Sequence, residues 1–255
     1  MSHPAHDLVT RYREQIASRL ADLEERNATA LETVAQWLAD QISQDRLVHV
    51  YGPGGHSNLA SQEVFFRAGG LMHMSAILDE GTLMSSGALR SMAVERTPGY
   101  GRIVMDQMRL GPDDLLILVN AYGINSTLID SALAARERGV KLIGISSRQH
   151  ADSIPPDHPA RHPSKANLHD VVDLHLDSDV PVGDAIMTVG TVTQNVGPVS
   201  TFANAFLLNS LVLLTVAELA ARGIDPPIWR SGNSPGGDQA NAQHTPRFVG
   251  RVKWL

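Results

Sequence analysis

From residue 46 onward, short apolar runs alternate with segments of helical periodicity, and this alternation restricts the possible fold more than any other feature. Residues 115–119 are five consecutive apolar residues, which is typical of a strand covered on both faces. They are followed by a predicted helix that ends at Gly139 and by a second buried strand over residues 140–145. The order strand, loop, helix, strand predicts a doubly wound, mainly parallel sheet with helices on both faces.

Segments on either side of this unit extend the same pattern. Further strands are predicted at residues 46–51, 71–78 and 171–176, and a further helix at 97–109. Residues 148–170 are rich in His, Pro, Ser and Asp, and we interpret them as a surface loop.

Long helices are predicted near both ends of the chain. Apolar residues at helical spacing predict helix over residues 5–44, with Asn27 as the point at which it breaks into two helices. A buried core helix is predicted over Ala203–Ala221. This segment is long enough to span a bilayer, but it contains the polar residues Asn204 and Glu218.

The composition excludes several classes of function. The chain has 21 Lys and Arg against 27 Asp and Glu, a formal net charge of −6, whereas a nucleic-acid binder needs clustered positive charge. Cysteine is absent from the sequence, which excludes disulfides and thiolate metal sites. The first residues do not combine a basic region with an apolar run, so we expect no secretory signal. We therefore expect a cytoplasmic protein that binds neither nucleic acid nor membrane.

A glycine-rich loop between a predicted strand and a predicted helix is the first candidate binding element. It contains Gly54, Gly55, His56, Ser57 and Asn58. Glycine lets the backbone approach a ligand closely, and a helix start offers free N–H groups to an anion. The loop lacks the Gly-Lys-Ser/Thr ending of a P-loop, and Ser57 stands where a dinucleotide-binding loop has its third glycine. We favour anion binding by this loop over a plain tight turn.

Two further strand ends carry polar side chains. The carboxyl ends of parallel strands meet at one edge of a sheet, and ligands collect there. The three strand ends together predict a pocket for a polar, anionic small molecule. The candidate binding residues after the second and third strands are Asn120, Tyr122, Gly123, Asn125, Ser126, Ser146 and Ser147.

Four side chains are candidates for proton transfer. Glu95 lies among turn residues and is the first candidate for a general base. Glu63 is held in reserve, because its pairing with Arg67 four residues later is an equally good interpretation. His56 and His150 are candidate acids, since imidazole titrates near neutral pH.

Metal binding is not predicted. His158, His162 and His169 are spaced by four and seven residues, but the prolines at 159 and 163 prevent them from sharing one helical face. We interpret them as surface histidines of a loop.

Several of these segments resemble SIS (sugar isomerase) domains. The segments that carry this resemblance are VHVYGPGGHS, DDLLILVNAYGINSTLIDSALAARERGVKLIGISS and GPVSTFANAFLLNSLV. A narrower likeness, to a little-characterised group of single-domain SIS proteins, rests on FFRAGGL, ILDE, ERTPGYG, PVGDA and PPIWRSGN followed by GGD. The resemblance extends over nearly the whole chain, from about residue 5 to residue 255.

The resemblance implies a flavodoxin-like α/β/α sandwich with a mainly parallel five-stranded sheet. Together with the residue patterns, it divides the chain into a helical segment at 1–44, the SIS domain at 45–223, and an irregular tail at 224–255, whose apolar residues we expect at a dimer interface. It also implies a homodimer or homotetramer that binds phosphosugars, with sites completed by a second subunit. The residues carried over to the anion site are Gly54, Ser57, Gly123, Asn125, Ser126, Ser146 and Ser147.

Two departures from the family pattern bear on the anion. The family usually reads SNSG where this chain has Asn120-Ala121-Tyr122-Gly123, so both serines are replaced. The first loop also carries one extra glycine, at position 54 or 55. A phosphate dianion needs several short donors, so a sulfonate or a neutral sugar end becomes a candidate beside phosphate.

Three functions are compatible with these residues. The first is an aldose–ketose isomerase that acts on an anionic sugar through an enediol and needs neither a metal nor a redox cofactor. The second is a non-catalytic sensor of sugar phosphates that acts through a partner. The third is an isomerase or deaminase of an amino sugar, which ammonia release would distinguish from simple isomerisation.

Overall fold

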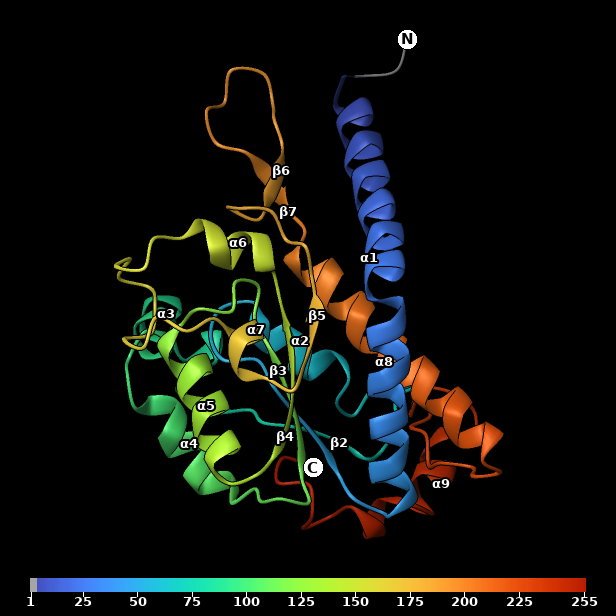
Figure 1. Cartoon of the computed structure of the whole chain (residues 1–255). Coiled ribbons are helices and arrows are strands. Elements are labelled where there is room, and N and C mark those ends of the chain that lie inside the picture. The colour runs from blue at the N-terminus through green and yellow to red at the C-terminus, as the bar shows by residue number, and fades with distance from the viewer. Residues whose placement is uncertain (1–3) are drawn as a thin grey trace.

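The computed structural model describes residues 4–255, and its centre is a five-stranded sheet in which every neighbouring pair of strands is parallel (Figure 1). The strand order is β2-β1-β3-β4-β5. The strands are β1 (Val48–Tyr51), β2 (Met74–Ala76), β3 (Leu115–Val119), β4 (Lys141–Ser146) and β5 (Leu174–Asp177). The predicted fold class is confirmed, and strands β2 and β5 are shorter than the predicted segments.

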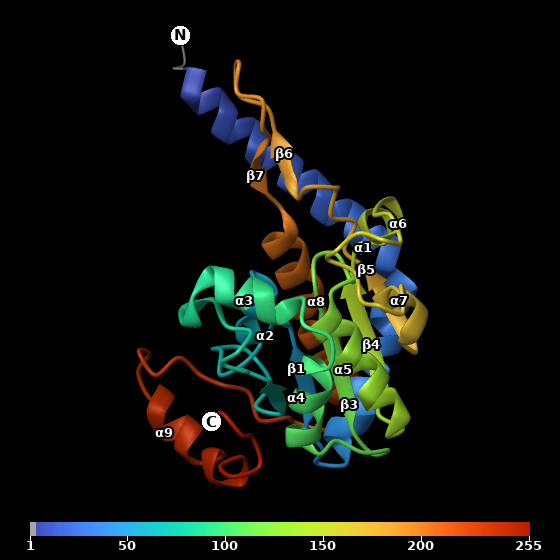
Figure 2. The ribbon, with the colours of Figure 1, turned by 90° about the vertical axis from the view of Figure 1, so that its left-hand side faces the viewer.

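Helices cover both faces of this sheet (Figures 1 and 2). One face packs against α1 (Pro4–Ser43), α2 (Ser57–Glu63) and α8 (Ser200–Ala221). The other face packs against α4 (Tyr100–Met108), α5 (Ser126–Glu137) and α7 (Leu168–Val171). Alternate residues of β3 point to the two faces, and all five are buried, which explains its uninterrupted apolar run.

The predicted break at Asn27 is wrong, because α1 is one continuous helix. The Asn27 amide nitrogen donates to the Asp177 carbonyl over 3.0 Å, and its oxygen accepts from the Asp177 backbone N–H over 2.8 Å. Asn27 therefore attaches the middle of α1 to the end of β5 instead of capping a second helix.

The predicted core helix is present as α8. It is long and apolar enough to cross a membrane by length and composition alone. In the folded chain it packs along α1, with Leu207, Leu208 and Leu211 buried against the sheet. Figure 1 shows α1 and α8 on the same side of the sheet.

Residues 148–170 are more ordered than the predicted surface loop. They contain α6 (Arg148–Ser153) and the first residues of α7. After β5 the chain forms an antiparallel pair, β6 (Ala185–Met187) and β7 (Val196–Pro198), beside the N-terminal part of α1 (Figures 1 and 2). The Tyr12 hydroxyl donates to the Pro198 carbonyl over 2.5 Å and joins the two segments.

The remaining short helices lie outside the layers. Between β2 and α4 the chain forms η1 (Met84–Ser86) and α3 (Ala88–Glu95), and the tail contains α9 (Gly237–Ala242) and η2 (Thr245–Arg247). The tail packs on its own chain, where Trp229 and Phe248 are buried in a small core with Met72. Its place at a dimer interface stays a prediction.

Candidate functional site

Two adjoining cavities lie at the carboxyl ends of β1 and β3. The smaller one, here called the polar lobe, has a volume of about 200 Å³. It lies between the glycine loop after β1, the Asn120 segment after β3, the end of α3 and the start of α8. Its lining residues are Gly54, Gly55, His56, Ser57, Glu95, Asn120, Ala121, Tyr122, Asp184, Ser200 and Asn204.

The larger cavity, here called the wide lobe, has a volume of about 380 Å³. Four residues line both lobes, so the two cavities meet at Gly55, His56, Glu95 and Tyr122. The other lining residues of the wide lobe are Met84, Ala88, Met92, Arg96, Ile124, Asn125, His150, Ile154, His158 and Ala160.

The glycine loop is shaped to hold Glu95 close to the backbone. Gly54 has a φ of +79°, and a Cβ at this position would collide with the Glu95 carboxylate. The Asn58 amide donates to the Thr82 carbonyl over 2.7 Å and to the Gly55 carbonyl over 3.2 Å. Asn58 therefore fixes the loop from behind and does not line either cavity.

Asn120 links the two strand-end segments through both ends of its amide. Its oxygen accepts from the Tyr122 and Gly123 backbone N–H groups over 3.0 and 2.9 Å. Its nitrogen must therefore face the cavity, where it donates to Ser57 Oγ over 3.1 Å and to Glu95 Oε1 over 3.3 Å. Because Ser57 Oγ accepts this bond, its own proton is left for another acceptor.

The Glu95 carboxyl group has an altered acidity. Burial raises the pKa of Glu95 to about 7, although the Asn120 hydrogen bond and the positive charge of Arg96 act in the opposite direction. A carboxyl group with this pKa exchanges protons at neutral pH, as a general base of an enzyme must.

The start of α8 completes the polar lobe with residues that the sequence analysis did not single out. Asp184 accepts from the Val199 and Ser200 backbone N–H groups over 2.9 and 2.8 Å, and from the Ser200 hydroxyl over 2.7 Å. The carboxylate thus caps α8 and fixes its first turn beside the cavity. Asn204 is buried one turn later, and its Oδ1 has no hydrogen-bond partner among residues 4–255. A ligand hydroxyl is a suitable partner for this oxygen.

Aromatic stacking forms the wall between α6 and the cavities. The rings of Tyr122 and His150 are stacked, with 3.6 Å between centroids and 15° between planes. Burial lowers the pKa of His150, which favours a neutral imidazole. His56 is exposed and lines both lobes. Two candidate acids therefore lie at the site, one on the glycine loop and one in the wide lobe.

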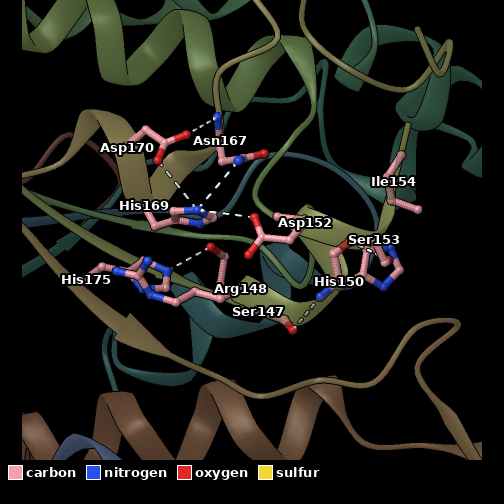
Figure 3. Close-up of polar contacts among 12 residues, drawn as sticks. Ser147, Arg148, His150, Asp152, Ser153, Ile154, Asn167, His169, Asp170 and His175 are labelled. Carbon is pink, nitrogen blue, oxygen red and sulfur yellow. Dashed lines mark hydrogen bonds and ion pairs between the residues drawn. The ribbon is translucent and has the colours of Figure 1, made fainter. Parts of the chain in front are cut away.

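Ser146, the last residue of β4, and Ser147 do not line either cavity. Ser147 Oγ accepts from the His150 backbone N–H over 3.2 Å and donates to the Val180 carbonyl over 2.7 Å, so it caps α6 (Figure 3). Ser146 Oγ forms a 3.0 Å hydrogen bond with His175 Nε2, and burial lowers the pKa of His175 to about 3. Both hydroxyl groups take part in contacts within the protein.

Four other predicted site residues are distributed around the pocket. Asn125 lines the wide lobe, where its amide donates to the Ala160 carbonyl over 3.2 Å. Gly123 and Ser126 line neither lobe. Glu63 lies at the far end of α2, where it accepts from Arg67 over 3.2 Å and from Asn209 over 3.0 Å. This geometry agrees with the interpretation of Glu63 as the ion-pair partner of Arg67.

The loop histidines have separate surroundings. His162 Nε2 lies 3.0 Å from Asp130 Oδ1, and His158 lines the wide lobe. Figure 3 shows His169 between Asp152 and Asp170, whose Oδ1 atoms lie 3.6 and 3.5 Å from its Nε2. Within the part of the chain that the structure describes, no group of three or more His, Asp or Glu residues is arranged to hold a metal ion.

The comparisons with known proteins agree with this architecture. Residues 11–147 match the SIS domain family. The chain is 32% identical over 248 residues to a UPF0309 protein of Halalkalibacterium halodurans, with 97% of each chain covered. It is 33% identical over 245 residues to a UPF0309 protein of Brucella canis, with 96% of this chain and 98% of that one covered.

Among solved structures, the fold is similar to that of a phosphoheptose isomerase from Francisella tularensis. The TM-score is 0.54 at 13% identity, with 84% of this chain and 100% of that chain covered. The match to the family covers the segments that form the sheet edge and the glycine loop. The chain therefore belongs to the SIS-domain family and, within it, to the group of UPF0309 proteins.

Proposed function

We propose that this protein is an aldose–ketose isomerase that acts on an anionic sugar. The observation that carries the proposal is Glu95, a carboxyl group with a pKa of about 7 at the junction of two cavities. Membership of the SIS-domain family and the similarity in fold to a phosphoheptose isomerase support the same reaction class.

In the proposed reaction, the Glu95 carboxylate removes the proton from the carbon next to the sugar carbonyl. The electron pair of the C–H bond forms a C=C bond, and the carbonyl oxygen gains the negative charge of an enediolate. The Ser57 hydroxyl and the His56 imidazole line the polar lobe and can donate to this oxygen. A proton then passes from the hydroxyl group on the carbon that lost its C–H proton to the former carbonyl oxygen, with Ser57 or His56 as the carrier, and a new carbonyl group forms on that carbon. The electron pair of the C=C bond takes the proton from Glu95 onto the former carbonyl carbon, so that the reaction is redox-balanced without a cofactor.

Asn120 acts as a positioning residue. Its amide nitrogen binds Glu95 and Ser57 at once, while two backbone N–H groups fix its oxygen. This arrangement accounts for the replacement of the family's first serine by Asn, since a serine is too short to bridge both partners. Because the Asn120 amide is occupied by Glu95 and Ser57, other residues of the cleft must distinguish a phosphate tail from a sulfonate tail.

The experiment that tests this function is proton exchange from solvent. The protein is incubated in D₂O with aldose and ketose phosphates of five to seven carbons and with the corresponding sulfonates. NMR should detect deuterium bound to carbon next to the carbonyl, together with conversion of aldose to ketose. Absence of exchange in every sugar that binds would contradict the proposal and favour the sensor. Release of ammonia from an amino sugar would favour the deaminase.

We also infer that the working form is a homodimer or homotetramer, as the resemblance to SIS domains implies. Two large apolar side chains of α8, Phe202 and Leu213, are 46% and 71% exposed, which supports contact with another subunit. Light scattering coupled to gel filtration should give a mass of two or four chains. A monomer at micromolar concentration would contradict this inference.

A further inference from the structure

The two lobes differ in the charged residues that line them. Among the described residues that line the polar lobe, the formal charges come from the carboxyl groups of Glu95 and Asp184, and none is a Lys or an Arg. The wide lobe is also lined by Glu95, but it lacks Asp184 and adds the guanidinium group of Arg96 together with the imidazoles of His150 and His158. An anionic group therefore meets two carboxyl groups in the polar lobe, whereas in the wide lobe the positive charge of Arg96 offsets the charge of Glu95.

Arg96 is available for a ligand. Its residue is exposed, and within residues 4–255 its guanidinium group makes no hydrogen bond or ion pair. Arg90, which lies on α3 itself, donates to the Glu80 carbonyl over 3.3 Å and lines neither lobe. An unpaired guanidinium presents a fork of N–H donors that matches the oxygens of a phosphate or a sulfonate.

Two further features of the wide lobe fit a charged tail. His150 is buried, and its Nδ1 has no hydrogen-bond partner among the described residues. Met84, Met92 and Ile154 also line this lobe, where they can contact the C–H groups of a sugar chain. The polar lobe alone is smaller than the roughly 300–1,000 Å³ of ordinary ligand pockets, whereas the two lobes together fall within that range.

We propose that the wide lobe is the anion subsite, where Arg96, His150 and His158 bind the charged tail of an extended acyclic sugar. The carbonyl end then enters the polar lobe and lies beside Glu95, Ser57 and Asn204. This assignment rests on the proposed function in that the ligand is a sugar. It differs from the site that the family resemblance implies, of whose residues only Asn125 lines the wide lobe. The residues of that implied site are Gly54, Ser57, Gly123, Asn125, Ser126, Ser146 and Ser147.

Binding of inert polyols tests this assignment without turnover. The probes are glucitol 6-phosphate, ribitol 5-phosphate and 6-deoxy-6-sulfoglucitol, each compared with its uncharged polyol by calorimetry at pH 7. These compounds lack a carbonyl group and cannot be isomerised. At least one charged polyol should bind tenfold or more tightly than its neutral counterpart. If none does, the subsite proposal is wrong.

The variant Arg96→Gln should remove most of this tenfold advantage and leave the affinity for the neutral polyol unchanged. Arg90→Gln is the matched control, on the helix that Arg96 follows, and should keep the advantage. Thermal melts of both variants check that the fold is intact, as expected for substitutions of exposed side chains. Retention of the full advantage in Arg96→Gln would overturn the assignment.

The two proposals fail separately. Binding that depends on Arg96 without any proton exchange in D₂O would remove the isomerase and leave the anion subsite. Proton exchange that proceeds equally well in Arg96→Gln, at sugar concentrations well below saturation, would remove the subsite and leave the isomerase.

Discussion

The segments that follow β3 and β4 look alike in the sequence but have different surroundings in the structure. Both come after a buried strand, and both carry small polar side chains at the carboxyl edge of the sheet. Asn120 lines the polar lobe and bonds to Ser57 and Glu95, whereas Ser147 caps α6 and bonds to Val180. Position at a strand end thus makes a side chain a candidate but does not show that its donors are free for a ligand.

The first prediction tests the polar lobe, where Asn120 bonds to Glu95, by displacing the Glu95 carboxylate. Gly54→Ala should lower the rate of proton exchange by at least about 100-fold, because the new methyl group displaces the Glu95 carboxylate and the residue is strained at positive φ. Gly55→Ala is the matched control, since it shares the positive φ but a Cβ there meets no atom within 4 Å. Equal losses in the two variants would mean that backbone strain, and not the position of Glu95, causes the effect.

The second prediction concerns pH. Only ionised Glu95 can act as a base, so kcat/KM for exchange should rise about tenfold per pH unit below pH 7 and level off above it. Between pH 5 and pH 8 the expected increase is about 100-fold. A rate that is constant over this range would show that a group with a different pKa removes the proton.

The third prediction compares Ser147, which caps α6, with Ser57, the partner of Asn120 in the polar lobe. Ser147→Ala should lower the free energy of unfolding by about 1–3 kcal/mol, because two buried backbone groups lose their partner. It should leave sugar affinity unchanged. Ser57→Ala should lower affinity for charged and neutral polyols alike by about threefold to tenfold, with a smaller loss of stability. The reverse pattern, measured by urea unfolding and calorimetry, would move the site to the β4 side.

The fourth prediction concerns how the ionisation of Glu95 changes the stability of the folded protein. The pKa of Glu95 is raised in the folded chain from its ordinary value to about 7, so ionisation opposes folding, and stability is lost as pH rises from about 4.5 to 7. Glu95→Gln removes this cost. The variant should be more stable than the unaltered protein by about 1–3 kcal/mol at pH 8, and the difference should fall toward zero near pH 4.5. Urea unfolding at both pH values measures this, and a difference independent of pH would contradict the raised pKa.

The sequence predicts the fold and part of the lining because those signals are local. The apolar run of β3 and the glycine cluster after β1 each identify an element by themselves. Glu95 is found because turn residues follow it in the sequence, although the helix that it ends, α3, is not among the predicted helices. The expected break at Asn27 fails because its partner, Asp177, is 150 residues away.

The remaining lining residues come from segments that only the folded chain brings together. Asp184 and Arg96 lie within the motifs PVGDA and ERTPGYG, which carry the family resemblance, and this was the one signal that could have identified them. Asn204 lies in an apolar helix, where an isolated polar residue is more often structural. The hydrogen bonds that occupy Ser146 and Ser147 reach His175 and Val180 on later segments, so residue spacing does not reveal them.

The most direct test of the account compares proton exchange in Glu95→Gln and Glu63→Gln. Each variant is incubated with a sugar that exchanges in the unaltered protein, and deuterium at the carbon next to the carbonyl is followed by NMR. Glu95→Gln should lose exchange while its sugar affinity stays within a few-fold, and Glu63→Gln, which removes an ion pair outside the cleft, should keep it. Full exchange in Glu95→Gln together with loss in Glu63→Gln would contradict the account.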